Sequence, residues 1–298
     1  MKVLRNLLIV ILTVTLTLGF VYVIWNYLLP NSLQSRVKNA FGIMEDYGIT
    51  GEEYEFNTEL YPYFNCLSDD GKKLYAQVYA NALARRTTFV PVVNVTTSEV
   101  ENVVKLVYYD HPELFWMDSG YSYKYIENDI CVQIILKFND TSENFDESKR
   151  LFEEKANTII EEANKFSSDY EKEQYVYMAI INCTEYDDSA SAHQSPYSAL
   201  VNGKSVCAGY ARAFQYIMLK LGIPTYYCAG MTEGHAWNIV KLENGYYNVD
   251  LTWADKNEEF DRYLNRTDDS LGYSHRRSGY SVLLPKCNSK KYINIDEQ

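Results

Sequence analysis

The most restrictive feature of the sequence is a helical pattern that begins at Cys207 and is followed at once by two strand-like runs. Gly222-Ile223-Pro224 ends the helix, because glycine favours the C-terminal cap and proline cannot continue a helix. The residues that share one face at helical spacing are Cys207, Tyr210, Ala211, Phe214, Ile217, Met218 and Leu221. The pattern therefore predicts a helix with one buried face and Cys207 in its first turn.

Two alternating runs flank a hairpin turn signal at residues 243–245. His235 stands at the start of the first run, and Asp250 lies inside the second. A tight Asn-Gly turn places both on one face but sets Asp250 opposite Ile239, about 13 Å along the strand from His235. A register shifted toward residues 242–243, or a twisted and bulged hairpin, would bring His235 and Asp250 together, and the sequence leaves these alternatives open.

Cys207, His235 and Asp250 are the residue types that nucleophilic catalysis by a thiol requires. The unpaired N–H groups of a first helical turn and the helix dipole favour a thiolate over a thiol. A histidine can remove and later return the thiol proton, and a carboxylate fixes the imidazole tautomer and stabilises the imidazolium. Each residue alone has a plainer interpretation, as a core cysteine, a satisfied polar group or a strand-end cap. Their joint occurrence favours the catalytic one.

Residues 170–255 resemble the transglutaminase-like superfamily, which has a papain-like fold and contains cysteine acyl-transfer enzymes. The resemblance rests on the blocks SALVNGKSVCAGYARAF, GHAWNIV and YYNVDLTW, and the flanking CTEYDDSASAHQSPYSAL and SHRRSGYSVLLPKCNSKKY are similar to segments of bacterial members. It implies an α+β fold in which the catalytic helix packs on an antiparallel sheet. It also implies that Cys207 is the nucleophile, His235 the base and acid, and Asp250 the residue that orients His235.

The residues around this trio have less definite roles. The backbone N–H of Cys207 is expected in an oxyanion hole, because a helix start directs such donors at developing charge. Gln194 is the candidate for a second donor, and an ordinary loop residue is the alternative. Trp237 and Trp253 are expected in the core, where they would also shield the thiol and imidazole from water. The remaining histidines show no partner pattern and are interpreted as structural; they are His111, His193 and His275.

Charge and cysteine spacing exclude several classes of partner. The net charge of -12 leaves no basic face for phosphates, so nucleic acid is not an expected partner. The sequence contains no paired CxxC motif and no EF-hand-like acidic loop, so we expect no cofactor and no metal. If Cys207 is a free thiol, five of the six cysteines remain, and at least one more must be unpaired.

An uncharged apolar run covers residues 7–29, directly after Lys2 and Arg5. At about 1.5 Å per residue such a helix is about 34 Å long, which is enough to cross a bilayer. The basic residues before it predict a single-pass membrane protein whose catalytic domain lies outside the cytoplasm. The alternative is a cleaved signal peptide, but its apolar core would usually be about 7–15 residues long.

The rest of the chain has no repeat and no low-complexity linker. Residues 97–113 read as a surface helix that opens with Ser98 and Glu101 at capping-box spacing, and a β-hairpin is expected around Asn128-Asp129. The expected units are a signal anchor at 1–30, a connector at 31–58, an N-terminal α+β region of unknown role at 59–142 and a transglutaminase-like catalytic domain at 143–298.

Three functions fit these expectations. The first is an extracytoplasmic cysteine peptidase or amidase, in which water resolves the acyl-enzyme. The second is a protein-glutamine transamidase that passes the acyl group to an amine, and the third is an inactive binding scaffold. Water far exceeds any amine in concentration, and the sequence shows no acceptor groove, so hydrolysis is favoured. The expected partners are a peptide or protein substrate, such as a cell-wall peptide or surface protein, and the membrane through the anchor.

Overall fold

The computed structural model describes residues 15, 17, 19–25, 46–231, 234–243, 245–257 and 260–293. Among these residues, no helix combines the length and the apolar character needed to cross a membrane. Most of the predicted anchor at 7–29 and the first part of the connector lie outside the described residues. The anchor and the location that it implies therefore stay predictions from the sequence.

The described residues form the mixture of helices and strands that an α+β fold requires. The first part contains α3 (Pro62–Asn65), α4 (Asp69–Leu83), β1 (Thr88–Phe89), α5 (Thr97–Asp110), β2 (Met117–Tyr125) and β3 (Cys131–Phe138). The second part contains α6 (Phe145–Ala163), α7 (Asp169–Cys183), β4 (Glu185–Tyr186), β5 (Lys204–Ser205), α8 (Cys207–Lys220), β6 (Thr225–Ala229), β7 (Ala236–Leu242), β8 (Gly245–Val249), α9 (Leu251–Asn257) and α10 (Asp268–Leu271).

Local sequence signals explain where the helices begin. The Ser168 hydroxyl caps α7 by accepting the N–H of Glu171, and the Glu171 carboxylate accepts the N–H of Ser168 in return. Helix α5 has the same reciprocal cap, but Thr96 and Glu99 form it. The expected box at Ser98 and Glu101 was therefore wrong by two residues. The β2–β3 hairpin turns at Asn128 and Asp129, as predicted, and both residues have positive φ angles that asparagine and aspartate tolerate.

Two three-stranded sheets organise the fold. The first has the order β1-β3-β2, and the second has the order β6-β7-β8 with antiparallel pairing throughout. In the second sheet Leu242 pairs with Gly245 and Asn238 pairs with Val249. The connection between β7 and β8 is thus two residues long, and this register decides where the ends of both strands meet.

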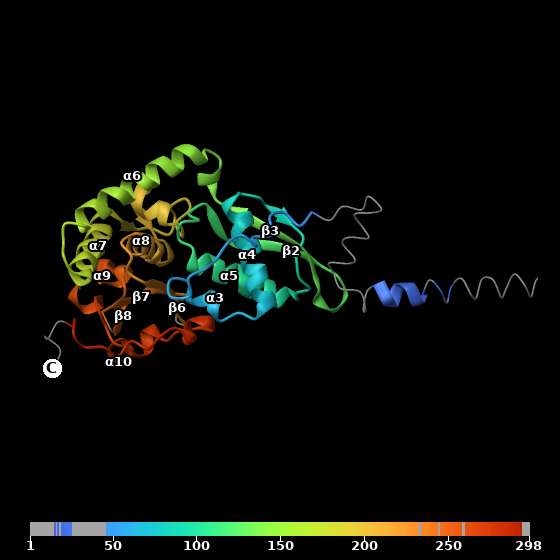
Figure 1. Ribbon diagram of the computed structural model, residues 1–298. Helices are drawn as coiled ribbons and strands as arrows, with labels where there is room; N and C mark the ends of the chain where they lie inside the picture. The colour runs from blue at the N-terminus through green and yellow to red at the C-terminus, as the bar shows by residue number, and fades with distance from the viewer. Residues whose placement is uncertain are drawn as a thin grey trace, which may run out of the picture.

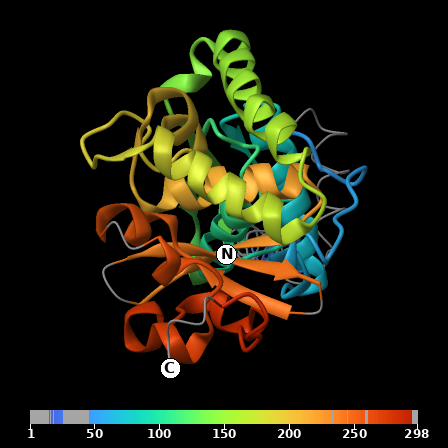
Figure 2. The same ribbon diagram turned by 90° about the vertical axis from the view of Figure 1, so that its left-hand side faces the viewer.

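The β6-β7-β8 sheet lies between two layers of chain. Helix α8 packs against β6 and β7, and α6 and α7 lie beyond it on the same side, whereas the C-terminal segment that contains α10 covers the opposite side (Figures 1 and 2). This is the predicted arrangement of a helix on an antiparallel sheet. The C-terminal segment was not expected to complete the other layer.

One cluster of buried apolar side chains runs from the N-terminal region into the second part of the chain. Phe115, which follows α5, has its ring 4.6 Å from that of Phe152 in α6. The hydroxyl of Tyr63 in α3 donates to the carbonyl of Tyr227 in β6 over 2.6 Å. The two regions are packed against each other, while the domain boundary expected near residue 143 stays a prediction.

The loop at residues 193–195 fixes the start of α8. The carbonyl of His193 accepts the N–H of Val206 at 3.1 Å and the hydroxyl of Ser205 at 2.6 Å. Gly209 allows this close approach, because a Cβ at that position would lie 2.8 Å from the His193 carbonyl oxygen and 2.9 Å from that of Ser195. Both distances are shorter than a normal contact, both oxygens belong to the backbone, and the hydroxyl oxygen of Ser205 would lie closer still.

We expect Gly209→Ala to lower the free energy of unfolding by about 1–3 kcal/mol, because the new methyl group would push the 193–195 loop away from α8. Thermal unfolding measures the effect. Gly120→Ala is the matched control, since its Cβ would meet its nearest neighbour, the Asp118 side chain, at 3.4 Å. Equal melting temperatures for the two variants would contradict the proposed tight approach.

Candidate active site

Cys207 is the first residue of α8, as the helical pattern predicted. The preceding residue, Val206, is extended and offers no side-chain cap. Its carbonyl accepts the N–H groups of Gly209 and Tyr210 at 2.9 and 3.1 Å, while the N–H of Cys207 has no acceptor within the helix. Cys207 is only partly buried. Its thiol and its free N–H are therefore presented together at the positive end of a helix.

His235 directly precedes β7, and Asp250 directly follows β8. The pairing of Asn238 with Val249 places Asp250 beside Trp237, not opposite Ile239 as a tight Asn-Gly turn would require. The observed register is shifted toward residues 242–243, which was one of the open alternatives. It leaves an offset of two residues, and an imidazole side chain can bridge that diagonal.

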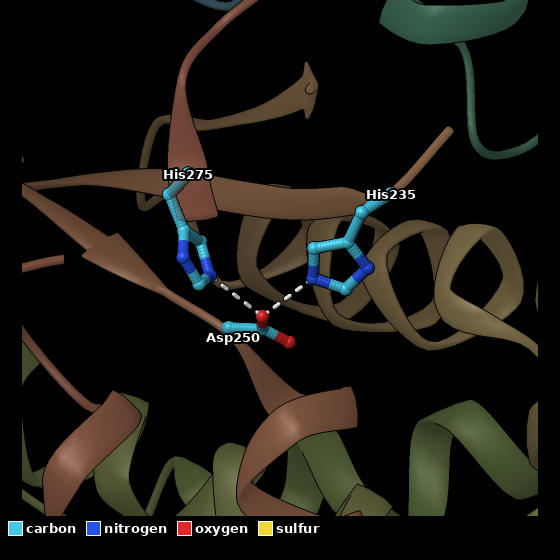
Figure 3. A group of neighbouring side chains, drawn as sticks. All are labelled: His235, Asp250 and His275. Atoms are coloured by element: carbon cyan, nitrogen blue, oxygen red, sulfur yellow. Dashed lines mark hydrogen bonds and ion pairs between the residues drawn. The ribbon is translucent and has the colours of Figure 1, made fainter. Parts of the chain in front are cut away.

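The structure brings His235 and Asp250 into direct contact. The Nε2 atom of His235 lies 2.6 Å from Oδ2 of Asp250 (Figure 3). Cys207 contributes to raising the pKa of the same imidazole, so its thiol lies near His235. A carboxylate accepts but does not donate, so the neutral imidazole must carry its proton on Nε2, and Nδ1 is left as the base for the thiol. The structure thus brings the three predicted catalytic residues together, with a hydrogen bond between His235 and Asp250 and with Cys207 near the imidazole.

Burial and charge act in opposite directions on these residues. Burial alone would lower the pKa of His235, but the charge and hydrogen bond of Asp250, with a smaller effect from Cys207, raise it to about 9. Burial alone would raise the pKa of Asp250, but His235 and His275 lower it to about 2. The pair is therefore held as a carboxylate facing an imidazolium at neutral pH.

His275 belongs to the site, although it was interpreted as a structural residue. It ends a short 3₁₀ helix, η6 (Gly272–His275), and its Nε2 lies 2.8 Å from Oδ2 of Asp250 (Figure 3). The same carboxylate oxygen thus accepts from two imidazoles. No periodic pattern connects residue 275 to the hairpin, so the sequence carried no direct signal for this contact.

Two indole rings enclose the imidazoles. The Trp237 ring is 5.9 Å from that of His235 and 4.9 Å from that of His275, and the Trp253 ring is 5.4 and 4.9 Å from the same two rings. The indole N–H of Trp237 donates to Asn248 over 2.9 Å. Trp237 is buried in the core as expected, whereas Trp253 is partly buried and packs against the core.

His235, Asp250 and His275 are also the described residues whose ligand atoms lie close enough to hold a metal ion, within 4.8 Å of one another. The two nitrogen–oxygen distances of 2.6 and 2.8 Å are those of charge-assisted hydrogen bonds, and shared protons account for them. A zinc ion bound here would occupy the Nε2 atom of His235 that holds Asp250. When hydrogen bonds rather than a zinc ion join these side chains, Nδ1 of His235 can act as the base for the Cys207 thiol.

Gln194, the candidate oxyanion donor, is exposed and lies on the wall of a pocket of about 340 Å³. Its carbonyl accepts the hydroxyl of Tyr108 at 3.0 Å, and the structure shows no hydrogen bond between its side chain and Cys207. The pocket is lined by Tyr108, Met117, Asp118, Ser119, Asn139, Asp140, Ser191, Ala192, His193, Gln194 and Ser195. The role of Gln194 stays a prediction, and the N–H of Cys207 is the donor that the helix start supplies.

The other cysteines differ from Cys207 in their surroundings. All six cysteines are free thiols in the structure. Burial raises the pKa of each of the other five, to about 12 for Cys228, and they are Cys66, Cys131, Cys183, Cys228 and Cys287. Among the described residues, Cys207 is the cysteine that contributes to raising the pKa of His235.

Part of the chain is similar to known proteins. Residues 157–251 match the family model described as the transglutaminase-like superfamily, and this segment contains Cys207, His235 and Asp250 but not His275. A solved structure titled "Crystal structure of a TGase" aligns with 17% sequence identity, a TM-score of 0.33 and coverage of 52% of this chain. The alignment spans 50% of that solved chain. A search of curated proteins finds no match.

The ion pair predicts how stability depends on pH. The pKa of His235 is raised to about 9 from 6.5, so its contribution is complete below pH 6.5 and is lost as the pH rises through about 9. The pKa of Asp250 is lowered to about 2 from 3.8, so its contribution is present above pH 3.8 and is lost as the pH falls through about 2. We expect the free energy of unfolding of the wild-type protein to exceed that of Asp250→Asn by the largest amount, on the order of 3 kcal/mol, between about pH 4 and 6.5.

Denaturant unfolding of both proteins across the pH range measures this difference. Other buried carboxyls also titrate, because burial raises the pKa of Asp110 to about 7 and that of Glu173 to about 8. Their contributions cancel when the two proteins are compared at each pH. A stability difference that stays constant between pH 6 and 10 would contradict the assigned ion pair.

Proposed function

We propose that this protein is a cysteine peptidase or amidase that acts through a thioester acyl-enzyme on Cys207. The observation that carries the proposal is the grouping of Cys207, at a helix start, with His235, whose imidazole is hydrogen-bonded to Asp250. The similarity of residues 157–251 to the transglutaminase-like superfamily supports the same class of cysteine chemistry. An inactive scaffold is the weaker reading, since a scaffold has no need to keep all three residues in register.

Acylation follows from the geometry of this grouping. The sulfur of Cys207 attacks the carbonyl carbon of the substrate amide, and the proton of the thiol resides on Nδ1 of the His235 imidazolium. Asp250 keeps the ring oriented and stabilises the imidazolium. The negative charge that develops on the substrate oxygen faces the free N–H of Cys207. The intermediate then expels the amine, which leaves with the proton from His235, and a thioester remains on Cys207.

The thioester is resolved by water in the proposed reaction. His235 removes a proton from the attacking water, the acid product leaves, and the thiol of Cys207 is restored with that proton. The proposed substrates are peptides or proteins, and a location outside the membrane would make surface proteins and cell-wall peptides accessible. This location follows from the apolar run at 7–29 and is part of the proposal.

The pocket of about 340 Å³ is the proposed position of the substrate chain. Its wall includes the 193–195 loop, which is hydrogen-bonded to the residue before Cys207. Tyr108 connects the pocket with the surroundings of Cys207. It lines the pocket, and its pKa is raised mainly by burial and to a smaller extent by the charge of Cys207. Cys207 does not line the pocket itself, so the proposed substrate path runs from this pocket along the 193–195 loop to the start of α8.

One observation favours the second candidate, transfer of the acyl group to an amine. The pocket carries two carboxylates, Asp118 and Asp140, and a protonated amine is attracted to such a surface. Asp140 also accepts the hydroxyl of Ser191 across the pocket wall. Transamidation needs the same triad and the same thioester, so only the final acceptor differs between the two candidates.

The test incubates the full-length protein with glutamine-containing peptides and surface proteins, with and without a labelled primary amine. We expect cleavage or deamidation to exceed incorporation of the amine. Cys207→Ala should lower the rate at least about a thousandfold, since it removes the nucleophile. Cys183→Ala is the matched control and should keep the wild-type rate, because Cys183 is exposed and lies at the end of α7.

The outcomes separate the candidates. Amine incorporation that exceeds hydrolysis and disappears in Cys207→Ala would contradict the proposed hydrolase and favour a transamidase. Activity that survives unchanged in Cys207→Ala would contradict both enzymes and leave the binding scaffold.

A further inference from the structure

We propose that His275 is a positioning residue of the active site, which holds the Asp250 carboxylate in the orientation that fixes His235. The inference rests on the proposed function, because it assigns a second histidine to the same catalytic grouping. His275 lies outside the segment 157–251 that the family model matches, so that similarity assigns it no role. Figure 3 shows the two imidazoles approaching Asp250 from opposite sides.

The hydrogen bonds of Asp250 leave the carboxylate little freedom to rotate. Its Oδ1 accepts the backbone N–H of Trp253 at 3.0 Å, and its Oδ2 accepts from His235 at 2.6 Å and from His275 at 2.8 Å. Three donors arrive from three different segments of the chain. Without His275, one of the two donors on Oδ2 is lost, and the contact with His235 would have to hold that oxygen alone.

The ring of His275 is itself held in place from several sides. His275 is 7% exposed, and its Nδ1 lies 2.9 Å from the hydroxyl of Ser274. Its ring packs edge-on against Trp237 and Trp253, at interplanar angles of 71° and 74°. The same indoles contact His235. Because the ring of His275 is fixed in this way, its hydrogen bond can hold the Asp250 carboxylate in one position.

A purely structural role is the alternative, in which His275 only attaches the C-terminal segment to the sheet. Other contacts already provide this attachment. The N–H of Met231 donates to the carbonyl of Arg276 at 2.8 Å, and the hydroxyl of Ser278 donates to the carbonyl of Gly230 at 3.0 Å. Because Ser278 holds the same segment without touching Asp250, Ser278→Ala separates loss of attachment from loss of positioning.

The test measures the rate at which iodoacetamide alkylates Cys207 in the full-length protein near neutral pH, with the site read by peptide mass spectrometry. This rate reports the thiolate and its imidazole partner and needs no substrate. We expect His275→Leu to alkylate about tenfold more slowly than wild type, because the carboxylate loses a buried donor and no longer fixes His235. Ser278→Ala should react within about twofold of wild type.

A pair of amide variants provides a conservative control and keeps the test decisive if His275→Leu does not fold. The amide nitrogen of His275→Gln reaches the position of Nε2 and should restore most of the rate. The shorter side chain of His275→Asn does not reach Asp250, so this variant should react as slowly as His275→Leu. Thermal unfolding of each variant shows that the folded protein is being compared.

The results distinguish this inference from the proposed function. Rapid alkylation of Cys207 in wild type, with the same rate in folded His275→Leu or His275→Asn, would overturn the role of His275 and leave the triad intact. An equal loss of rate in Ser278→Ala would also overturn it in favour of attachment. Slow alkylation of Cys207 in wild type, unchanged by replacing His235, would overturn the proposed function and the inference with it.

Discussion

A single buried carboxylate, that of Asp250, determines the geometry of this site. A charge with no exposure to solvent is costly unless it is paired and hydrogen-bonded, and Asp250 is fully buried. Its partners come from the start of β7, from the C-terminal segment and from the backbone of α9. The carboxylate thus connects the hairpin to the segment that covers the sheet. Removing one partner would leave a charge that the surrounding indoles cannot solvate.

In the proposed function, the chemistry of Cys207 depends on this carboxylate through His235. The hydrogen bond at Nε2 leaves Nδ1 facing the thiol, and the positive end of α8 provides the N–H that meets an oxyanion. The 193–195 loop fixes the first turn of α8 and also forms part of the pocket wall. In the proposed function, substrate binding and activation of the thiol therefore depend on the same few backbone contacts. An isolated ring with the opposite tautomer would present no base to Cys207.

The sequence was sufficient for the features that follow from local pattern. The start of α8 at Cys207 and the β2–β3 turn at Asn128-Asp129 were predicted from periodicity and turn residues. The β7–β8 register was left open, because turn preference alone does not fix which residues pair, and one step at the turn moves Asp250 by two positions relative to its partner. His275 was not recognised, since its contact joins segments that no pattern relates. The cap at Thr96 was missed because two overlapping pairs had the same spacing.

The tautomer of His235 tests the central claim most directly, and a chain with four histidines makes its nitrogen signals assignable. Long-range proton–nitrogen spectra of the ¹⁵N-histidine-labelled protein, recorded above the pKa of about 9, report which ring nitrogen keeps its proton. The account predicts a proton on Nε2 of His235 and a loss of this preference in Asp250→Asn. A proton on Nδ1 of His235 in the wild-type protein would contradict it, because the imidazole would then have no lone pair to receive the proton of Cys207.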